Sequence, residues 1–324
     1  MKTLVTGATG LVGNNVVRLL IEKNQPVRVL VRANSDPRPL AGLDVEFAFG
    51  DVRDESAVRT ASRGVDQIVH AAALVHIGWS QLEQQREINV KGSRLIAEAA
   101  LAEGIRLVHV SSVDALGLGV AGIAADEETP RAGKTPCSYV ITKREAEVAV
   151  REVIDRGLDG RIVNPGFMLG PWDWKPSSGR MLIAVGKRFA VLAPTGGCTV
   201  CDVRDVASGI LAALEQGESG RNYILGGFHQ TYFELWRLFA RVGGSRPPVA
   251  RLGPAMRFLV GRSGDWISRW TRGELEINSA AMAMSSLFHY HTSARAVAEL
   301  GYQNRPLEQT IQDAWEWFSA YGYV

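Results

Sequence analysis

Cysteine is scarce in this chain of 324 residues, which contains only Cys137, Cys198 and Cys201. So small and odd a number argues against a disulfide framework, and a packed core must therefore stabilise the fold. Cys198 and Cys201 have the Cys-x-x-Cys spacing, but a redox centre needs a helix N-terminus and a zinc site needs further ligands nearby. We interpret both cysteines as core residues of a strand-like segment at 199–203.

Metal-ligand spacing and an excess of one charge sign are also missing. The six histidines show no such spacing, so no metal is expected. The formal net charge of +2 provides no bulk attraction for nucleic acid or an anionic membrane, and neither is expected as a partner. No apolar run is long enough to span a bilayer, and no cationic leader with an apolar segment precedes the first strand. These absences predict a cytoplasmic protein.

The chain does contain enough apolar residues, 46% of the total, to bury a large core. Short apolar segments alternate with helical patterns at about 2–6, 27–31, 44–48, 66–70, 106–111 and 160–164. This alternation predicts an α/β fold with a doubly wound parallel sheet of the Rossmann type. We assign residues 1–165 to a dinucleotide-binding domain, to which about 199–228 returns, and residues 166–324 to a smaller, mainly helical substrate-binding lobe with helices at 231–242, 255–270, 293–300 and 306–321.

A glycine loop joins the first strand to the first helix. Gly7, Gly10 and Gly13 follow the strand Lys2–Thr6, and the helical pattern Leu11–Glu22 begins within the loop. In this position the glycines permit a tight turn, close approach of the backbone to a pyrophosphate, and close packing of helix on strand. The first gap is one residue longer than in the usual fingerprint, but the strand–loop–helix order predicts a dinucleotide site.

Tyr139 and Lys143 lie four residues apart in the helical segment 138–156. Residues with this spacing share one helix face about 5–6 Å apart, so the ammonium is expected beside the phenol. A free phenol has a pKa of ~10, and bringing it near neutrality needs roughly 4 kcal/mol. Lys143 and the positive ring of an oxidised nicotinamide could supply this in a partly desolvated cleft. The pair therefore indicates a tyrosine acid/base.

Together these features resemble the extended short-chain dehydrogenase/reductases. The resemblance covers essentially the whole chain and is carried by Thr6–Gly13, Gly50–Val52, His70–Ala73, Asn89–Ser93, Val110–Ser112, Tyr139 with Lys143, Asn164–Gly166 and Asp202–Val206. Within the family the chain is most similar to the dihydroflavonol-reductase-like and aldehyde-reductase-like branch, as indicated by Val27–Arg32, Leu169–Pro171 and the ending Glu299–Phe318.

The resemblance implies a catalytic set of Ser112, Tyr139, Lys143 and Asn89. Ser112 would donate to a substrate carbonyl, Tyr139 would transfer the proton, and Lys143 would also hold the nicotinamide ribose. Ser111 is the rival of Ser112, because adjacent strand residues point to opposite sides. Asn89 would anchor a water that restores the proton; the alternative is a helix-interior residue that bonds to backbone.

The implied cofactor site joins the glycine loop to the ends of several strands. It comprises Gly7, Thr9, Gly10, Leu11, Val12, Arg32, Asp51, Val52, Ala71, Ala72, Ala73, Tyr139, Lys143, Pro165 and Gly166. An NAD site places a carboxylate after the second strand, whereas this chain has Arg32 there and no acid before Asp36. Because an arginine can bind a 2′-phosphate bidentately, NADP(H) is the expected cofactor and NAD(H) the alternative.

Substrate residues are expected after the fourth and sixth strands, at His76, Trp79, Phe167, Met168, Trp172 and Trp174. Their apolar and aromatic character favours an uncharged ketone or aldehyde, which the enzyme would reduce to an alcohol. A nucleotide-sugar epimerase or dehydratase with tightly bound cofactor is the alternative, and a non-catalytic NADP-binding regulator is a third. The resemblance also suggests a homodimer through two long helices.

The segment Met256–Trp270 is amphipathic and contains two tryptophans. We interpret it as a packed helix of the lobe, with a role at a membrane surface or against an apolar ligand as the alternative.

Overall fold

The computed structural model describes residues 1–324 except 121, 269, 271–273 and 276. A seven-stranded sheet of order β10-β6-β5-β4-β1-β2-β3 forms its centre, and every strand pair in it is parallel. The order reverses between β1 and β4, which is where doubly wound folds bind their ligands. The elements of this unit are β1 (Thr3–Thr6), α1 (Leu11–Glu22), β2 (Val27–Val31), β3 (Glu46–Phe49), α2 (Glu55–Ser62), β4 (Gln67–His70), α3 (Leu82–Gln85), α4 (Gly92–Glu103), β5 (Arg106–Val110), α5 (Ser138–Ile154), β6 (Gly160–Pro165), α7 (Val203–Gln216) and β10 (Asn222–Leu225).

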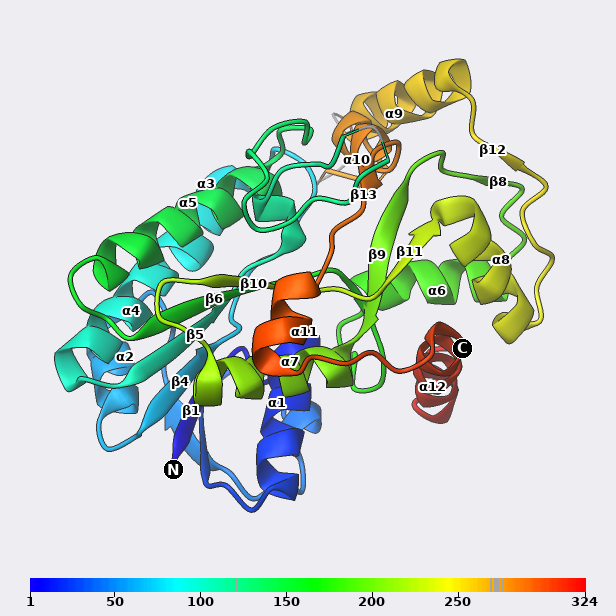
Figure 1. Ribbon diagram of the computed structural model, residues 1–324. Coiled ribbons are helices and arrows are strands. Elements are labelled where there is room, and N and C mark those ends of the chain that lie inside the picture. Colours follow the sequence, from blue (N-terminus) through cyan, green and yellow to red (C-terminus); the bar gives the residue numbers. More distant parts are fainter. Residues whose placement is uncertain (121, 269, 271–273, 276) are drawn as a thin grey trace.

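Helices cover both faces of the sheet (Figure 1). Alternate strand residues point to opposite faces, so Val5 packs in the core under α1 and α7 whereas Leu4 packs in the core under α2, α4 and α5. Strands buried on both faces read as continuous apolar runs, and this is why the sequence predicted their positions. The Rossmann fold predicted from the alternating pattern is confirmed.

A second packing unit, which we call the lobe, lies beyond the carboxyl ends of the strands (Figure 1). It contains a four-stranded sheet in which β9 pairs with β7, β11 and β13. The elements of the lobe are β7 (Phe167–Leu169), α6 (Ser178–Lys187), β8 (Leu192–Ala193), β9 (Gly197–Asp202), β11 (Phe228–Thr231), α8 (Tyr232–Gly243), β12 (Ala250–Arg251), α9 (Pro254–Ser268), α10 (Ser279–Met284), β13 (Phe288–His289) and α12 (Leu307–Ala320), while α11 (Ala294–Leu300) packs against α7 and β10.

The return of the chain from the lobe is divided between the two units. α7 packs on α1 and β10 pairs with β6, so both belong to the central unit. β9 and β11 belong to the sheet of the lobe. The sequence did not predict α6, α10 or the lobe sheet, because β7, β8 and β13 are too short for a periodic pattern and α6 follows a run rich in proline and glycine. A domain boundary at residue 165 stays a prediction.

Two of the cysteines have the environment expected from the sequence. Cys198 and Cys201 are free and buried in β9, and burial raises the pKa of the Cys198 thiol to about 12. Their interpretation as core residues is confirmed.

The helix predicted at 255–270 is α9, which ends at Ser268, while residue 269 lies outside the described residues. In the described parts of the chain, no helix has the length and apolar character that crossing a membrane requires.

Candidate active site

The glycine loop turns sharply between β1 and α1. Gly7 has φ +72°, and a Cβ there would lie 2.6 Å from the Ala71 carbonyl carbon, so only glycine fits against the end of β4. A Cβ on Gly13 would lie 2.4 Å from the Gly7 oxygen, which explains the close packing of α1 on the loop. Gly10 differs, because its Cβ would meet only the Gly7 oxygen, at 3.4 Å.

The helix end behind this loop is suited to an anion. α1 has no acidic residue in its first turn, and in the described part of the chain no side chain caps its N-terminus at Gly10. Its first N–H groups and the positive end of its dipole therefore face the space above the loop. The loop is tied to β4, since the Thr6 hydroxyl accepts from Ala72 N at 3.3 Å and lies 2.7 Å from His70 Nδ1. The loop and this helix end fit a dinucleotide pyrophosphate, and its binding by Gly7, Thr9, Gly10, Leu11 and Val12 stays a prediction.

The adenosine end predicted for the site contains three arginines and two carboxylates. Asp51 accepts from Arg53 at 2.8 and 2.9 Å, and Asp36 pairs with Arg38 at 2.7 Å. Arg32 directly follows β2 and is exposed, and it contributes to the lowered pKa of Asp51, after the hydrogen bond from Arg53 as the largest cause. The carboxylate nearest to β2 in sequence is thus already paired with a cation.

Ser112 is held at the end of β5 by its main chain. Its carbonyl accepts from Asn164 Nδ2 at 2.9 Å, and the same amide donates to the buried Glu147 at 2.7 Å. The Ser112 hydroxyl accepts from Asp114 N at 3.1 Å. The same hydroxyl acts to lower the pKa of the Tyr139 phenol. Ser111 differs: its hydroxyl is buried without a hydrogen-bond partner among the described residues. The geometry therefore brings Ser112, rather than Ser111, to Tyr139.

Tyr139 holds its proton more firmly than the sequence suggested. Burial raises its pKa well above the ordinary value and Asp114 adds to the rise, while the hydrogen bond with Ser112 opposes it. Lys143 Nζ lies 5.9 Å from the Tyr139 ring centroid and donates to the Val110 carbonyl at 3.0 Å. Burial and Asp114 thus act against a lowered phenol pKa. The expectation that Lys143 and an oxidised nicotinamide together lower this pKa stays a prediction for the cofactor-bound protein.

Lys143 is itself affected by burial, which lowers the pKa of its ammonium to about 8, although Glu147 and Asp114 act in the opposite direction. The site thus places a protonated phenol and a readily deprotonated amine on one face of α5. Such a pair can hold a proton on the phenol for transfer to an oxygen beside Ser112.

Asn89 lies in a π-helical turn, Arg86–Lys91, between α3 and α4. Its Nδ2 donates to the Leu74 carbonyl at 3.0 Å and to Thr142 Oγ1 at 3.2 Å, and its Oδ1 accepts from Leu74 N at 2.7 Å. These bonds occupy both amide hydrogens and hold the loop after β4 against α5, which matches the alternative of bonding to backbone. A water-anchoring role for Asn89 stays a prediction.

Apolar side chains from three segments pack around Tyr139. They form one cluster made of Cys137, Val140, Ala280 and Met284, with Ile77, Tyr139 and Leu287 against it. α10 thus provides part of the wall, which the sequence did not indicate because this helix has only six residues. His76 and Trp79 lie on the neighbouring loop, where His76 Nε2 and Trp79 N both contact Glu274, at 2.9 and 2.8 Å.

The aromatic residues expected after the sixth strand are not brought to Tyr139. Trp172 packs beneath Arg18, whose guanidinium lies 3.3 Å from its ring centroid, and Trp174 contacts Trp317 and Tyr321 of the C-terminal segment. Phe167 and Met168 lie in β7, against β9. Trp172 and Trp174 therefore pack the lobe, and their substrate role is a prediction that these contacts do not support. Pro165 and Gly166 end β6, where Gly166 N donates to the Leu225 carbonyl at 3.1 Å.

A buried ionic cluster links the Ser112 turn to the lobe. Lys134 Nζ lies 3.0 Å from Asp114 Oδ1 and 2.7 Å from His289 Nδ1. Burial alone would raise the pKa of Asp114, but Lys134 and His289 together hold it well below its usual range. Asp114 therefore stays a carboxylate beside the active site. Sequence reasoning missed this cluster because its members are far apart in the chain and carry no motif.

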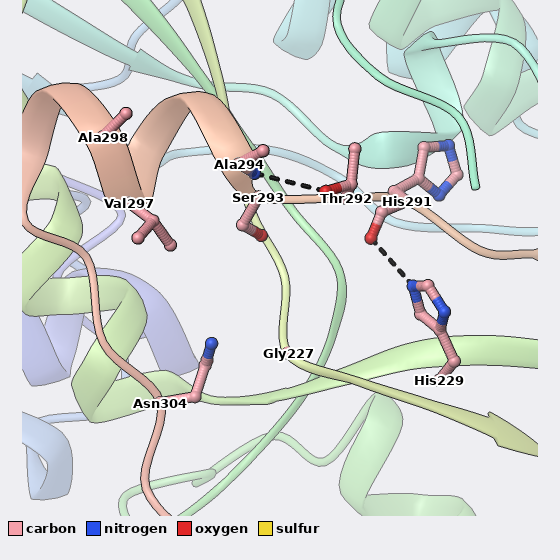
Figure 2. A pocket seen from close by; sticks show the side chains of 9 residues that line it. All are labelled: Gly227, His229, His291, Thr292, Ser293, Ala294, Val297, Ala298 and Asn304. Carbon is pink, nitrogen blue, oxygen red and sulfur yellow. Dashed lines mark hydrogen bonds between the residues drawn. The ribbon is translucent and has the colours of Figure 1, made fainter. Parts of the chain in front are cut away.

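The open hollow shown in Figure 2 is separate from these residues. It lies between the β10–β11 connection and α11 and is lined by Gly227, His229, His291, Thr292, Ser293, Ala294, Val297, Ala298 and Asn304. His229 Nε2 lies 3.0 Å from the His291 carbonyl across it. Ser112, Tyr139 and Lys143 do not line this hollow. The candidate active site is therefore at the carboxyl edge of the central sheet and not in the hollow.

A glycine-loop fold with Ser112, Tyr139 and Lys143 at the carboxyl edge defines the class of NAD(P)-dependent oxidoreductases. The model of the NAD dependent epimerase/dehydratase family matches residues 3–226, and the chain belongs to this family. The protein is an NAD(P)-dependent enzyme of the extended short-chain dehydrogenase/reductase type.

Individual relatives match over almost the full chain. Sterol demethylase protein B of Methylococcus capsulatus is 32% identical, over 100% of both chains. A Synechocystis sp. protein provisionally named dihydroflavonol 4-reductase is 32% identical, over 99% of this chain and 95% of that one. The crystal structure of gox2253 matches with a TM-score of 0.85 and 35% identity, over 99% of this chain and 98% of that chain.

We predict that Tyr139→Phe lowers turnover by about 10²–10⁴-fold, because it removes the transferable proton. The dissociation constant for NADPH, measured by fluorescence titration, should stay close to that of the wild type. Tyr321→Phe, which removes a phenol in the aromatic cluster of the lobe, is the matched control and should keep full turnover. Near-normal turnover in the Tyr139 variant contradicts the acid/base assignment.

A second prediction concerns Asp173, which follows Trp172. Burial raises the pKa of its carboxyl to about 7, although backbone N–H groups of Gly179 and Ser177 oppose the rise. With an unfolded value of ~3.9, the folded state binds this proton more tightly, so the stabilisation is complete below pH ~4 and is lost as the pH rises to ~7. The loss corresponds to about 4 kcal/mol.

Asp173→Asn should remove this slope from the free energy of unfolding measured in urea between pH ~4 and ~7. The exposed Asp44→Asn is the control and should keep it. An unchanged slope in the Asp173 variant would show that this carboxyl is ionised in the folded protein.

Proposed function

We propose that the protein is an NADP(H)-dependent reductase that converts an uncharged, apolar ketone or aldehyde into an alcohol. The observation that carries the proposal is the position of Tyr139, which packs against the apolar cluster of Cys137, Val140, Ala280 and Met284 and lies beside Ser112. Reduction of a carbonyl needs a proton donor and an oxygen-binding hydroxyl in a space from which water is excluded.

Ser112, Tyr139 and Lys143 each have a different role in such a reaction. Ser112 is held by Asn164 through its carbonyl, which leaves its hydroxyl near Tyr139 to orient a carbonyl oxygen. Tyr139 supplies the proton to that oxygen, and the low pKa of Lys143, caused by burial, suits an amine that exchanges protons at neutral pH. A bound nicotinamide would supply the hydride. The apolar wall favours a substrate with an aliphatic chain or a fused ring system.

The names of the two curated relatives support an apolar substrate, since one refers to a sterol and the other to a dihydroflavonol. Sterols and flavonols are flat ring systems without a diphosphate. A cluster of apolar side chains around the acid/base tyrosine suits such a molecule better than a nucleotide sugar, whose diphosphate requires cationic partners.

Two features of the segment after β2 support NADP(H) over NAD(H) as the cofactor. Arg32 occupies the position after β2 at which NAD sites place a carboxylate, and it is exposed. Asp36, the first acid after it, is bound by Arg38, which reduces its repulsion of a 2′-phosphate. A charged bidentate contact from Arg32 would discriminate between the two cofactors.

We predict that NADPH binds at least about tenfold more tightly than NADH, since a bidentate charged contact contributes roughly 1.5–3 kcal/mol. Arg32→Asp should reverse the order by placing a carboxylate where the 2′-phosphate sits. Arg59→Asp, on the exposed face of α2, is the matched control and should change neither dissociation constant. Equal titration curves for the two cofactors in the wild type would show that Arg32 does not select the cofactor.

The reaction type is tested by stoichiometry. The purified protein should consume one NADPH for each alcohol formed from a panel of steroid, flavonoid and aliphatic carbonyl compounds, followed by loss of NADPH absorbance and by mass spectrometry. It should also lose its cofactor on dialysis, because a reductase releases oxidised cofactor in every turnover. Retained cofactor and interconversion of nucleotide sugars without a net absorbance change would contradict the reductase and support an epimerase.

A further inference from the structure

α9 packs on the protein through its glycines and not through its large apolar side chains, unlike an ordinary amphipathic helix. Its buried residues are Gly261 and Gly264. A Cβ on Gly264 would lie 1.8 Å from the Ile277 carbonyl oxygen, and one on Gly261 would lie 3.0 Å from Ser279 Cα. The helix therefore contacts the α10 segment with small residues, which allow backbone to approach backbone.

The large apolar side chains of α9 point the other way. Met256, Leu259 and Trp266 lie at helical spacing, and Leu259 and Trp266 are 61% and 60% exposed. Trp270, beyond the end of the helix, is 78% exposed. Phe258 and Ile267 widen this stripe. An exposed apolar stripe of this kind, rimmed by polar residues, marks an interaction surface rather than a packed helix. This exposure departs from our interpretation of the segment as an ordinary packed helix.

Two exposed valines also lie beside the short strands β8 and β12, the second of which precedes α9 in the chain. Val249 and Val191 are both exposed and are joined by a hydrogen bond from Val249 N to the Val191 carbonyl at 3.0 Å, next to the paired strands β8 and β12. Figure 1 shows α9 in gold at the outer end of the lobe, beyond α10 and far from the central sheet.

The segment that contains α9 is also strongly basic, and this charge indicates what kind of partner binds the exposed apolar stripe. Residues 241–272 contain seven arginines and one acid, a net charge of +6 in a chain whose total is +2. The remaining residues therefore carry −4. The one acid, Asp265, is turned inward and accepts from Ser279 N at 2.9 Å. The Arg262 guanidinium lies 5.6 Å from the Phe258 ring centroid, so cationic and apolar groups share one surface.

We propose that α9 and its flanking arginines bind the surface of an anionic lipid bilayer. Exposed apolar side chains enter the boundary between headgroups and acyl chains, tryptophans favour this boundary, and arginines meet the lipid phosphates. Binding to the bilayer does not depend on the reductase assignment. The formal net charge of the whole chain, +2, conceals this local concentration.

The bound helix would lie beside the candidate active site. α9 packs on α10, whose Ala280 and Met284 belong to the apolar cluster around Tyr139. Glu274, between α9 and α10, accepts from Trp79 N and Ser80 N at 2.8 and 2.9 Å, which joins this segment to the loop after β4. An apolar compound dissolved in the bilayer would then reach the site without crossing bulk water.

The test is co-sedimentation of the full-length protein with vesicles, without substrate or cofactor. The wild type should bind vesicles of mixed phosphatidylcholine and phosphatidylglycerol at least about tenfold more strongly than vesicles of phosphatidylcholine alone, since each arginine at such a surface contributes about fivefold. Raised salt should weaken the binding by screening. No binding of the wild type to the anionic vesicles overturns the proposal.

Two variants separate the apolar and the ionic contributions. Leu259→Ser with Trp266→Ser should lower binding at least about tenfold by removing exposed apolar area, and Arg251→Glu with Arg262→Glu should abolish the preference for anionic lipid. Val297→Ser and Arg59→Glu, at exposed positions on α11 and α2, are the matched controls. Thermal unfolding of each variant checks folding, and the charge variant carries the test if the serine variant unfolds.

Binding that both double variants retain overturns the proposal. So does a concentration-dependent dimer, measured by light scattering, that the serine variant disperses while no form of the protein binds vesicles. That result would assign the stripe to contacts between two copies of the chain.

Discussion

The pairing of buried charges at the carboxyl edge of the sheet is the constraint on which the site depends. Lys143 and Glu147 are buried there and Asp114 is mostly shielded from water, and an unpaired charge in such a place is strongly destabilising. Each is therefore tied to a different segment: Lys143 to the Val110 carbonyl, Glu147 to Asn164, and Asp114 to Lys134. These ties hold the end of β5, the end of β6 and the start of α5 in register, which is what positions Ser112 next to Tyr139.

The same burial determines the proton state of the site. A phenolate at Tyr139 would be desolvated and would face the carboxylate of Asp114, so the neutral phenol is favoured. The amine of Lys143 responds in the opposite sense, because burial disfavours its charged form. One environment thus produces a strong hold on the phenolic proton and a weakened hold on the ammonium proton. A raised pKa makes the phenol a weaker acid, so donation of its proton to a substrate oxygen requires a cation in the occupied site that lowers this pKa.

The sequence predicted the features that depend on neighbours in the chain. The buried parallel strands read as apolar runs, the glycine loop reads as a turn that admits no side chain at Gly7, and Tyr139 and Lys143 share a helix face by spacing alone. It could not predict features that depend on segments far apart. The contact of Lys134 with His289, the wall formed by α10, and the packing of Trp174 against Trp317 join residues more than a hundred positions apart. Nor could it show that burial and Asp114 raise the pKa of Tyr139.

The segment that contains α9 shows the same limit in another form. Periodicity established that Met256–Trp270 has an apolar and a small or polar side, but periodicity is unchanged when the helix is rotated about its axis. The rotation is set by the two glycines, because only the side with Gly261 and Gly264 can approach the Ile277 carbonyl closely. The large side chains are then left outside, next to arginines that the balanced total charge concealed. Close backbone contact on one side of a helix thereby creates the exposed surface on the other.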